Sequence, residues 1–276
     1  MSRYRHSFHA GNFGDVHKHV TLAALIGALE RKDKGFLYLE THAGRGAYDL
    51  ADSSESRAAA PAISRVLDRA ADHPELAAYA SAVVEWRARS ANPRGYPGSP
   101  LIAASLLRAQ DRAVLIEIAA AEAGALERTL GHRPRFSVVR ADGFERLRAY
   151  LPPQERRGLT LIDPPYERPG ELDRAGGAAA EALDRFPTGV VAVWYPIKDE
   201  RDTAVWHAAL RRRLSGALLI AELWLHPCDS RVALNGSGVV IANPPYRIAE
   251  RMQVWLTALH AALDPAGSGG ARVRLL

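Results

Sequence analysis

The chain has 276 residues, of which 47% are hydrophobic and 24% charged, so it is long enough for one large domain with a sizeable core. Its net charge of +5 and its pI near 9.5 are compatible with a polyanionic partner, although arginines spread along helices supply much of the excess. The single cysteine, Cys228, excludes an internal disulfide, and neither a signal peptide nor a membrane span is indicated, so we expect a cytoplasmic protein.

The first third of the chain opens with a polar, aromatic segment, residues 1–13, that has neither helix nor strand periodicity. A helix with a broad apolar face is predicted from Val16 to Leu29, and basic residues and Gly35 mark its end. Residues 36–39 then form a compact apolar run that predicts a strand, which enters the turn at residues 40–46.

Strand–helix alternation stops over residues 48–95, where residues 61–71 and 74–89 read as two helices rich in alanine and charge. We interpret residues 48–95 as a helical insertion within a single domain that spans the whole chain. After a loop at residues 94–100, Ser99 is well placed to cap a helix that Pro100 begins.

Alternation resumes beyond this point and predicts an α/β fold with a mostly parallel, doubly wound sheet covered on both faces. Helical segments thin out between the last three strands, which makes an antiparallel pair plausible at that end. Strands are expected at 113–118, 136–140, 159–162, 190–194, 218–225, 238–242 and near 272–275, and helices at 122–130, 144–150, 171–186 and 202–213.

The most informative stretch is Asp163-Pro164-Pro165-Tyr166, which directly follows the predicted buried strand at residues 159–162. The prolines end that strand and leave a carboxylate, rigid carbonyls and an aromatic ring at its tip. Acceptors and a ring so placed could hold a planar amine. Asp/Asn-Pro-Pro-aromatic after a strand is typical of amino-group methyltransferases that use S-adenosylmethionine, although a Pro-Pro turn with a helix-capping Asp explains the four residues equally simply.

A near copy, Asn243-Pro244-Pro245-Tyr246, makes the motif ambiguous when it is taken alone. The order of the strand ends distinguishes the two. Asp163 follows the fourth strand of the regular alternation, whereas Asn243 follows a late strand and has no glycine turn or acidic partner nearby. We therefore assign catalysis to Asp163 and interpret residues 243–246 as a structural turn.

The earlier strand ends predict a nucleotide site, because ligands of open α/β sheets lie beyond the carboxyl ends of the strands. Gly44 and Gly46 would let the backbone approach a ligand closely, but Asp49 breaks the dinucleotide-binding G-x-G-x-x-G pattern and disfavours a dehydrogenase. Glu117 ends the second strand and could accept from ribose hydroxyls, and Asp142 ends the third and could accept from an adenine amine. Either carboxylate alone could instead cap a helix. The nucleotide site is predicted from the order of four successive strand ends, which carry the glycine turn, Glu117, Asp142 and Asp163.

Several further segments match one family pattern along the whole chain. They are residues 4–12, Asp15-Val16 with Lys18-His19, and residues 41–44, 96–100, 141–144, 161–166, 194–196 and 243–245. On these segments, the chain resembles the RlmJ-type 23S ribosomal RNA adenine-N6 methyltransferases. The resemblance implies a Rossmann-like class I methyltransferase fold with an inserted helical subdomain. It also implies that His42, at a position where related motifs have their first glycine, is normal for the family. After Glu117 the chain reads Ile118-Ala119 where Leu-His is expected, which concerns only local packing.

The same resemblance implies the roles of the site residues, the cofactor and the partner. The methyl donor is S-adenosylmethionine, and the partner is 23S ribosomal RNA as naked or early-assembly RNA, bound by a monomer. Catalytic residues are Asp163, Pro164 and Tyr166. Cofactor contacts are His19, His42, Gly44, Ser99, Glu117, Asp142, Gly143 and Asp163, and RNA contacts are Tyr4, His6 and Lys18, within a substrate-facing arm and helix start at residues 1–19.

The residues themselves leave several alternatives open. Arg3, Arg5 and Lys18 could neutralise phosphates and Tyr4 could stack on a base, but a solvated basic arm would look the same. His17 and His19 do not share a helix face and no zinc pattern follows, so we expect no metal. Trp86, Trp206 and Trp255 lie in helical patterns and are expected in the core.

Three other functions compete with methylation of a ribosomal adenine. An amine methyltransferase could act on DNA adenine, although no appended recognition domain is visible, or on a protein glutamine, which would make Asn243 the active residue. A nucleic-acid-binding module without catalysis is the alternative from another class. It would bind RNA independently of the cofactor, and the complete set of strand-end residues argues against it.

Overall fold

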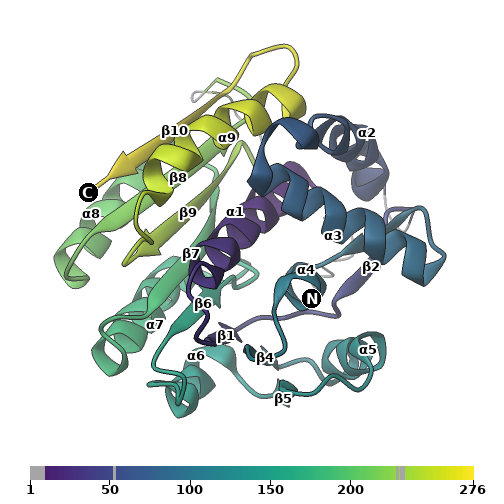
Figure 1. Cartoon of the computed structure of the whole chain (residues 1–276). Helices are drawn as coiled ribbons and strands as arrows, with labels where there is room; N and C mark the ends of the chain where they lie inside the picture. The colour runs from purple at the N-terminus through teal and green to yellow at the C-terminus, as the bar shows by residue number, and fades with distance from the viewer. Residues whose placement is uncertain (1–9, 52–53, 228–229, 231–233) are drawn as a thin grey trace.

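The computed structural model describes residues 10–51, 54–227, 230 and 234–276. Within this part of the chain, one sheet of eight strands runs in the order β10-β8-β9-β7-β6-β1-β4-β5, with helices on both faces (Figure 1). This is the α/β architecture expected from the alternation of strands and helices. The strands are β1 Leu37–Glu40, β4 Arg112–Glu117, β5 Phe136–Arg140, β6 Gly158–Ile162, β7 Val190–Ile197, β8 Leu218–Trp224, β9 Gly236–Ala242 and β10 Gly270–Leu275.

The sheet has a parallel half and an antiparallel half. Strands β7, β6, β1, β4 and β5 are parallel neighbours, so their carboxyl ends share one edge. Strand β9 runs antiparallel to both β7 and β8, and β10 runs antiparallel to β8. The antiparallel pairing anticipated at the C-terminal end is therefore confirmed, and it reverses the direction of the strand that precedes Asn243.

Two hydrophobic cores lie on opposite faces of the sheet. Helices α1, α4 and α9 contribute to the first core, and α7 and α8 to the second, as a doubly wound sheet requires. Trp255, which was expected in a helical pattern, lies on the C-terminal helix α9, whose bounds were not predicted. The helices outside residues 48–95 are α1 Phe13–Glu30, α4 Ser99–Leu106, α5 Ala120–Leu130, α6 Gly143–Arg146, α7 Glu171–Arg185, α8 Glu200–Arg213 and α9 Ile248–Leu263.

Helix α1 is buried on nearly every side, which explains why its apolar face looks so broad in the sequence. The Asn12 side chain caps it by accepting from the Asp15 amide at 3.0 Å. The helix runs between the sheet and α3, Pro74–Ser90 (Figure 1), so the polar residues of α1 face neighbouring elements instead of solvent.

The stretch at residues 48–95 contains helices α2 and α3, a short 3-10 helix η2, and most of a small two-stranded sheet. Its strands β2 and β3 pair antiparallel with Tyr48 opposite Tyr96, where we expected loops. The Tyr79 hydroxyl lies 3.2 Å from that of Tyr96, which connects α3 to β3. The elements are β2 Ala47–Asp49, α2 Ser54–Asp68, η2 Ala70–Asp72, α3 Pro74–Ser90 and β3 Gly95–Pro97.

Two local expectations were wrong. Gly98, not Ser99, is the N-cap of α4, and Ser99 is the first helical residue. The single helix expected at residues 144–150 is a four-residue α6 followed by a 3-10 turn, η3 Leu147–Tyr150. In addition, no helix of the described residues has the length and apolar character needed to cross a membrane.

Candidate functional site

Four parallel strands bring the residues singled out in the sequence to one edge of the sheet. Strands β6, β1, β4 and β5 are successive neighbours, and their carboxyl ends lead into Asp163, His42, Glu117 and Asp142 in that order. His42 and Glu117 are 75 positions apart in the sequence but lie close in space, because β1 pairs directly with β4 and residues 48–95 pack to one side. The expected grouping of strand tips is present.

Asp163 is held by a buried lysine. The Lys18 ammonium lies 2.6 Å from Asp163 Oδ2 and 2.7 Å from Asp15 Oδ1. The side chains of Lys18 and Asp163 are only 4% and 10% exposed. Burial alone would lower the pKa of Lys18, but the two carboxylates outweigh it and raise that pKa well above its usual range. Lys18 is therefore a permanent cation beside Asp163.

This position differs from the one expected for Lys18. A lysine that neutralises RNA phosphates must reach the surface, whereas this ammonium is enclosed between two carboxylates. The Asp15 carboxylate is fixed in turn by the Gly11 amide, which donates to Oδ2 at 3.0 Å. Lys18 thus belongs to the strand-tip site. The other predicted RNA residues, Tyr4 and His6, lie outside the described residues.

Two aromatic rings lie beside Asp163. Tyr166, with a left-handed φ of 55°, donates its hydroxyl to the backbone carbonyl of Trp194 on β7, and the two rings are tilted at 54° with centroids 5.7 Å apart. The Lys18 ammonium lies 5.7 Å from the centre of the Trp194 ring. Trp194 was noted in the sequence only as part of a family motif; its place on the strand next to β6 is what brings it here.

The indole of Trp194 is itself oriented by a polar chain. Its Nε1 donates to Ser237 Oγ at 2.8 Å, and His17 Nδ1 lies 2.9 Å from the same oxygen. Burial lowers the pKa of His17 to about 3, so this imidazole is neutral at pH 7. His17 therefore helps to orient Trp194 through Ser237.

The glycine turn after β1 is fastened to the tip of β4. Gly44 donates its amide to Glu117 Oε2 at 2.8 Å, and the Ala119 amide donates to Oε1 at 2.7 Å. Gly44 has a left-handed φ of 62°, and a Cβ there would lie 2.6 Å from the Tyr48 hydroxyl. Glu117 is thus both an acceptor at the site and the residue that orders the turn.

Asp142 and Gly143 form the corner at the tip of β5. Asp142 Oδ1 caps α6 by accepting from the Phe144 amide at 2.9 Å, as the capping alternative foresaw, while Oδ2 lies 3.4 Å from Arg174. A Cβ on Gly143 would come within 1.8 Å of the Thr41 carbonyl oxygen, so only glycine lets α6 approach β1 this closely. Oδ2 is the atom of Asp142 that can face a ligand.

His42 stands between these tips as a neutral side chain. Burial lowers its pKa to about 4, which the carboxylates of Asp163 and Asp142 only partly offset. Its ring packs edge-on against Phe144 at 4.7 Å, and Nδ1 lies 2.8 Å from the Thr41 hydroxyl. A neutral imidazole here would not repel a cationic ligand.

Glu40 and Ser99 form a buried pair behind the turn. Ser99 donates its hydroxyl to Glu40 Oε1, and Tyr38 donates to Oε2 at 2.8 Å. Burial raises the pKa of Glu40 to about 7, although these two hydrogen bonds and Lys18 oppose the shift. Ser99 therefore reaches the site through Glu40, at a position where its hydroxyl joins α4 to β1.

His19 is buried against strand β3. It is 1% exposed, its Nδ1 lies 2.9 Å from the Tyr96 hydroxyl, and the two rings stack at 5.6 Å. The predicted contact of His19 with a cofactor stays a prediction.

The second Pro-Pro-Tyr turn lies at the opposite edge of the sheet. Because β9 is antiparallel to β7, Asn243 follows a strand end beside the start of β7. Its Nδ2 donates to the carbonyls of Pro187 at 2.7 Å and Gly189 at 2.9 Å. Asn243 thus ties two loops together, far along the strands from Asp163.

The donor set suits an organic cofactor better than a metal. Among the described residues, no group of three or more His, Cys, Asp or Glu side chains could hold a metal ion. The strand tips offer carboxylate acceptors at Glu117 and Asp142, a close backbone approach at Gly44, and a neutral ring at His42. These groups match a nucleoside that carries a positive charge.

Comparisons with known proteins agree with this geometry. The family model described as ribosomal RNA large subunit methyltransferase D, RlmJ, matches residues 33–276. The chain is 40% identical to ribosomal RNA large subunit methyltransferase J of Escherichia coli K12 and 37% identical to that of Haemophilus influenzae Rd, over 99% and 98% of this chain and 98% and 96% of those proteins. A crystal structure from Legionella pneumophila Philadelphia 1 has 37% identity and a TM-score of 0.86, covering 96% of this chain and 98% of that one.

Proposed function

The chain belongs to the ribosomal RNA large subunit methyltransferase J family, and we propose that it transfers a methyl group from S-adenosylmethionine to the exocyclic N6 amine of an adenine in 23S ribosomal RNA. The resemblance predicted from the sequence motifs is thereby confirmed. The observation that carries the proposal is the Asp163 tip, which joins an acceptor, a buried cation and two aromatic rings beside the glycine turn.

For the cofactor, we assign the ribose hydroxyls to Glu117 and the adenine amine to Asp142 Oδ2, with Gly44 and Gly143 giving close backbone approach. His42 faces the charged centre as a neutral ring, Ser99 acts through Glu40, and His19 completes the family set. When bound, the cofactor supplies an electrophilic methyl group on a sulfonium sulfur. The carboxylates of Asp163 and Asp142 also favour a cation at this edge of the sheet.

The residues of this chain would make the adenine amine a better nucleophile. Asp163 Oδ1 forms no hydrogen bond within the described part of the chain, so it is available to accept from the amine while Oδ2 stays on Lys18. A second acceptor, the Pro164 carbonyl, would draw the other amine hydrogen and localise the nitrogen lone pair toward the methyl carbon. In-line positioning of these atoms accounts for much of the rate.

Tyr166 and Trp194 would receive the target base after it leaves its stack. Unstacking costs a few kcal/mol, less in a loop, and stacking on an aromatic ring returns about 1–3 kcal/mol. Lys18 acts through Asp163: its ammonium stabilises the carboxylate and fixes its orientation. The proton that leaves the amine is therefore released to solvent. Asp163 does not keep it, because its carboxylate is paired with the Lys18 cation.

Tyr4 and His6 would contact the RNA from the arm at residues 1–19, which continues into α1 and so leads directly to Lys18. We propose naked or early-assembly 23S RNA as the substrate of a monomeric, cytoplasmic enzyme. We also propose that residues 48–95 are an insertion in one methyltransferase domain, since their helices share the core of α1. The single cysteine fits the reducing cytoplasm, because it cannot form an internal disulfide.

The experiment compares Asp163→Ala with Asn243→Ala. We expect Asp163→Ala to abolish methyl transfer to 23S RNA while cofactor affinity, measured by calorimetry, changes much less. Asn243→Ala should keep its turnover and lose about 0.5–1.5 kcal/mol of stability, because one exposed and one partly buried carbonyl lose their donor. Normal turnover of Asp163→Ala would overturn the assignment, and loss of turnover in a folded Asn243→Ala would favour glutamine chemistry at the second turn.

A further inference from the structure

A pocket outside the strand-tip site lies between α3, α4 and the end of α5, with a cavity volume of about 210 Å³. Residues of three separate elements line it: Glu85, Trp86 and Arg89 of α3, Leu101 and Ser105 of α4, and Arg133 after α5. It is smaller than the roughly 300–1,000 Å³ typical of pockets for drug-sized ligands. A space of this size suits part of a nucleotide, such as a phosphate with its sugar.

Arg133 gives the pocket an uncompensated positive charge. Its guanidinium is half-buried and donates through Nη1 to the Ala104 carbonyl at 2.6 Å. In the described part of the chain it forms no ion pair with a carboxylate. A partly buried guanidinium with spare donors and no anion is well placed to bind one from outside.

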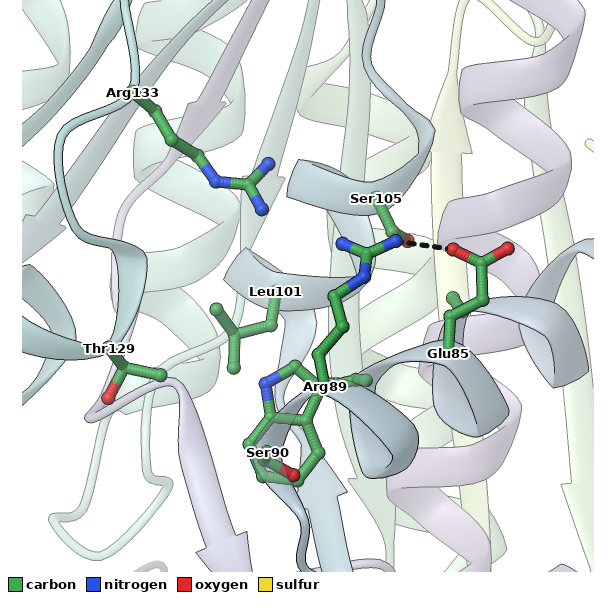
Figure 2. A pocket seen from close by; sticks show the side chains of 9 residues that line it. Glu85, Arg89, Ser90, Leu101, Ser105, Thr129 and Arg133 are labelled. Carbon is green, nitrogen blue, oxygen red and sulfur yellow. Dashed lines mark hydrogen bonds and ion pairs between the residues drawn. The ribbon is translucent and has the colours of Figure 1, made fainter.

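Arg89 adds a second cation that is only loosely held. It pairs with Glu85 four residues earlier on α3, but the two side chains are 61% and 55% exposed, so the pair is weak. Figure 2 shows the Arg89 and Arg133 side chains entering the same space over Leu101 from different elements. An incoming phosphate could take Arg89 from Glu85 at little cost.

Trp86 supplies an aromatic surface in the same pocket. Unlike Trp206 and Trp255, which are buried as expected, Trp86 is half-exposed and lines the cavity. Arginines interleaved with an aromatic ring are the combination that binds the backbone and bases of single-stranded nucleic acid. Leu101, which lines the pocket, also lies next to Gly46 of the glycine turn. The pocket is therefore close to the strand-tip site.

We propose that this pocket is an accessory RNA site, in which Arg89 and Arg133 contact backbone phosphates of the 23S substrate and Trp86 contacts the adjoining sugar or base. The proposal rests on the proposed function, because it takes the occupant to be the RNA that the enzyme methylates. It makes the helical insertion, through α3, part of the substrate-binding surface.

The test measures steady-state methylation of a 23S RNA transcript by the full-length Arg89→Ala/Arg133→Ala variant. We expect KM for RNA to rise about tenfold with unchanged kcat and cofactor affinity. The slope of log affinity against log salt should become shallower by about 1.4 on single-stranded RNA or about 1.8 on a duplex, as two lost phosphate contacts require. Arg133→Gln tests the same site while keeping a donor for the Ala104 carbonyl.

Two further variants separate RNA binding from a structural role. Glu85→Gln removes the competing carboxylate and should lower KM for RNA, whereas a purely structural ion pair predicts no gain. Arg185→Ala/Arg212→Ala is the matched control: Arg185 forms the same exposed i,i+4 pair on α7, at the other face of the sheet, and KM should not change. Wild-type KM and salt dependence in the pocket variant would overturn the accessory site while leaving the methyltransferase function intact; absence of RNA methylation by the wild type would instead overturn the proposed function.

Discussion

At the scale of single residues, the defining feature of the molecule is the Asp15–Lys18–Asp163 chain. One buried ammonium satisfies two carboxylates that are 148 positions apart in sequence but within 2.7 Å of the same nitrogen in space. A buried ion pair of this kind adds little net stability, but breaking it leaves an unpaired charge. In the mechanism that we propose, its role is to fix the orientation of the Asp163 carboxylate.

Lys18→Met tests this arrangement. The substitution keeps an apolar stem of similar length but leaves two buried carboxylates facing each other, so we expect urea unfolding to show a loss of about 3–5 kcal/mol together with loss of methyl transfer. Adding Asp15→Asn removes one of the facing charges and should restore part of the stability but not the activity. A Lys18→Met enzyme with normal stability and turnover would show that the ion pair has neither role.

Glu40 makes a prediction about pH. Burial raises its folded-state pKa to about 7, above the unfolded value, so between about pH 4.5 and 7 the folded state holds a proton that the unfolded state has lost. Stability from this group is therefore full below pH 4.5 and declines as the pH rises to 7. We therefore expect the free energy of unfolding of Glu40→Gln, measured in urea relative to wild type, to increase by up to about 3 kcal/mol between pH 5 and pH 8. A difference that does not change with pH would contradict the assignment.

At the scale of elements, the close approach of α6 to β1 depends on one hydrogen atom at Gly143. Gly143→Ala places a Cβ against the Thr41 carbonyl and must push α6 away, which displaces Asp142. We expect a destabilised protein with weakened cofactor binding by calorimetry. Gly27→Ala is the control: its Cβ would meet nothing within 4 Å in the middle of α1, so it should stabilise the protein by about 0.5–1 kcal/mol. Equal cofactor affinity in both variants would refute the packing argument.

The strand elements also explain which predictions succeeded. Strand ends could be predicted from the sequence, because an apolar run followed by Gly, Glu or Asp indicates the end of a strand whichever strands pair with it in the sheet. The parallel order of β6, β1, β4 and β5 then follows from regular alternation. The pairing of β2 with β3 could not be read so easily, because three-residue strands have too few positions to show a period.

At the scale of the whole molecule, the long-range contacts were the part that the sequence could not supply. Nothing near Lys18 in the chain indicates that Asp163 is its partner, and nothing near Arg133 indicates that it shares a pocket with Trp86. The turns that begin at Asn243 and Asp163 carry nearly the same four residues, and in the sequence only the order of the strands separates them. The structure adds the reversed direction of β9, which places Asn243 at one edge of the sheet and Asp163 at the other.

The most direct test of the proposed function is methyl transfer from labelled S-adenosylmethionine to 23S ribosomal RNA that lacks the modification, followed by digestion and identification of the product nucleoside. We expect N6-methyladenosine at a single adenine, formed by the wild type and not by Asp163→Ala. Label in another nucleoside, or in N6-methyladenosine formed equally well by Asp163→Ala, would contradict it.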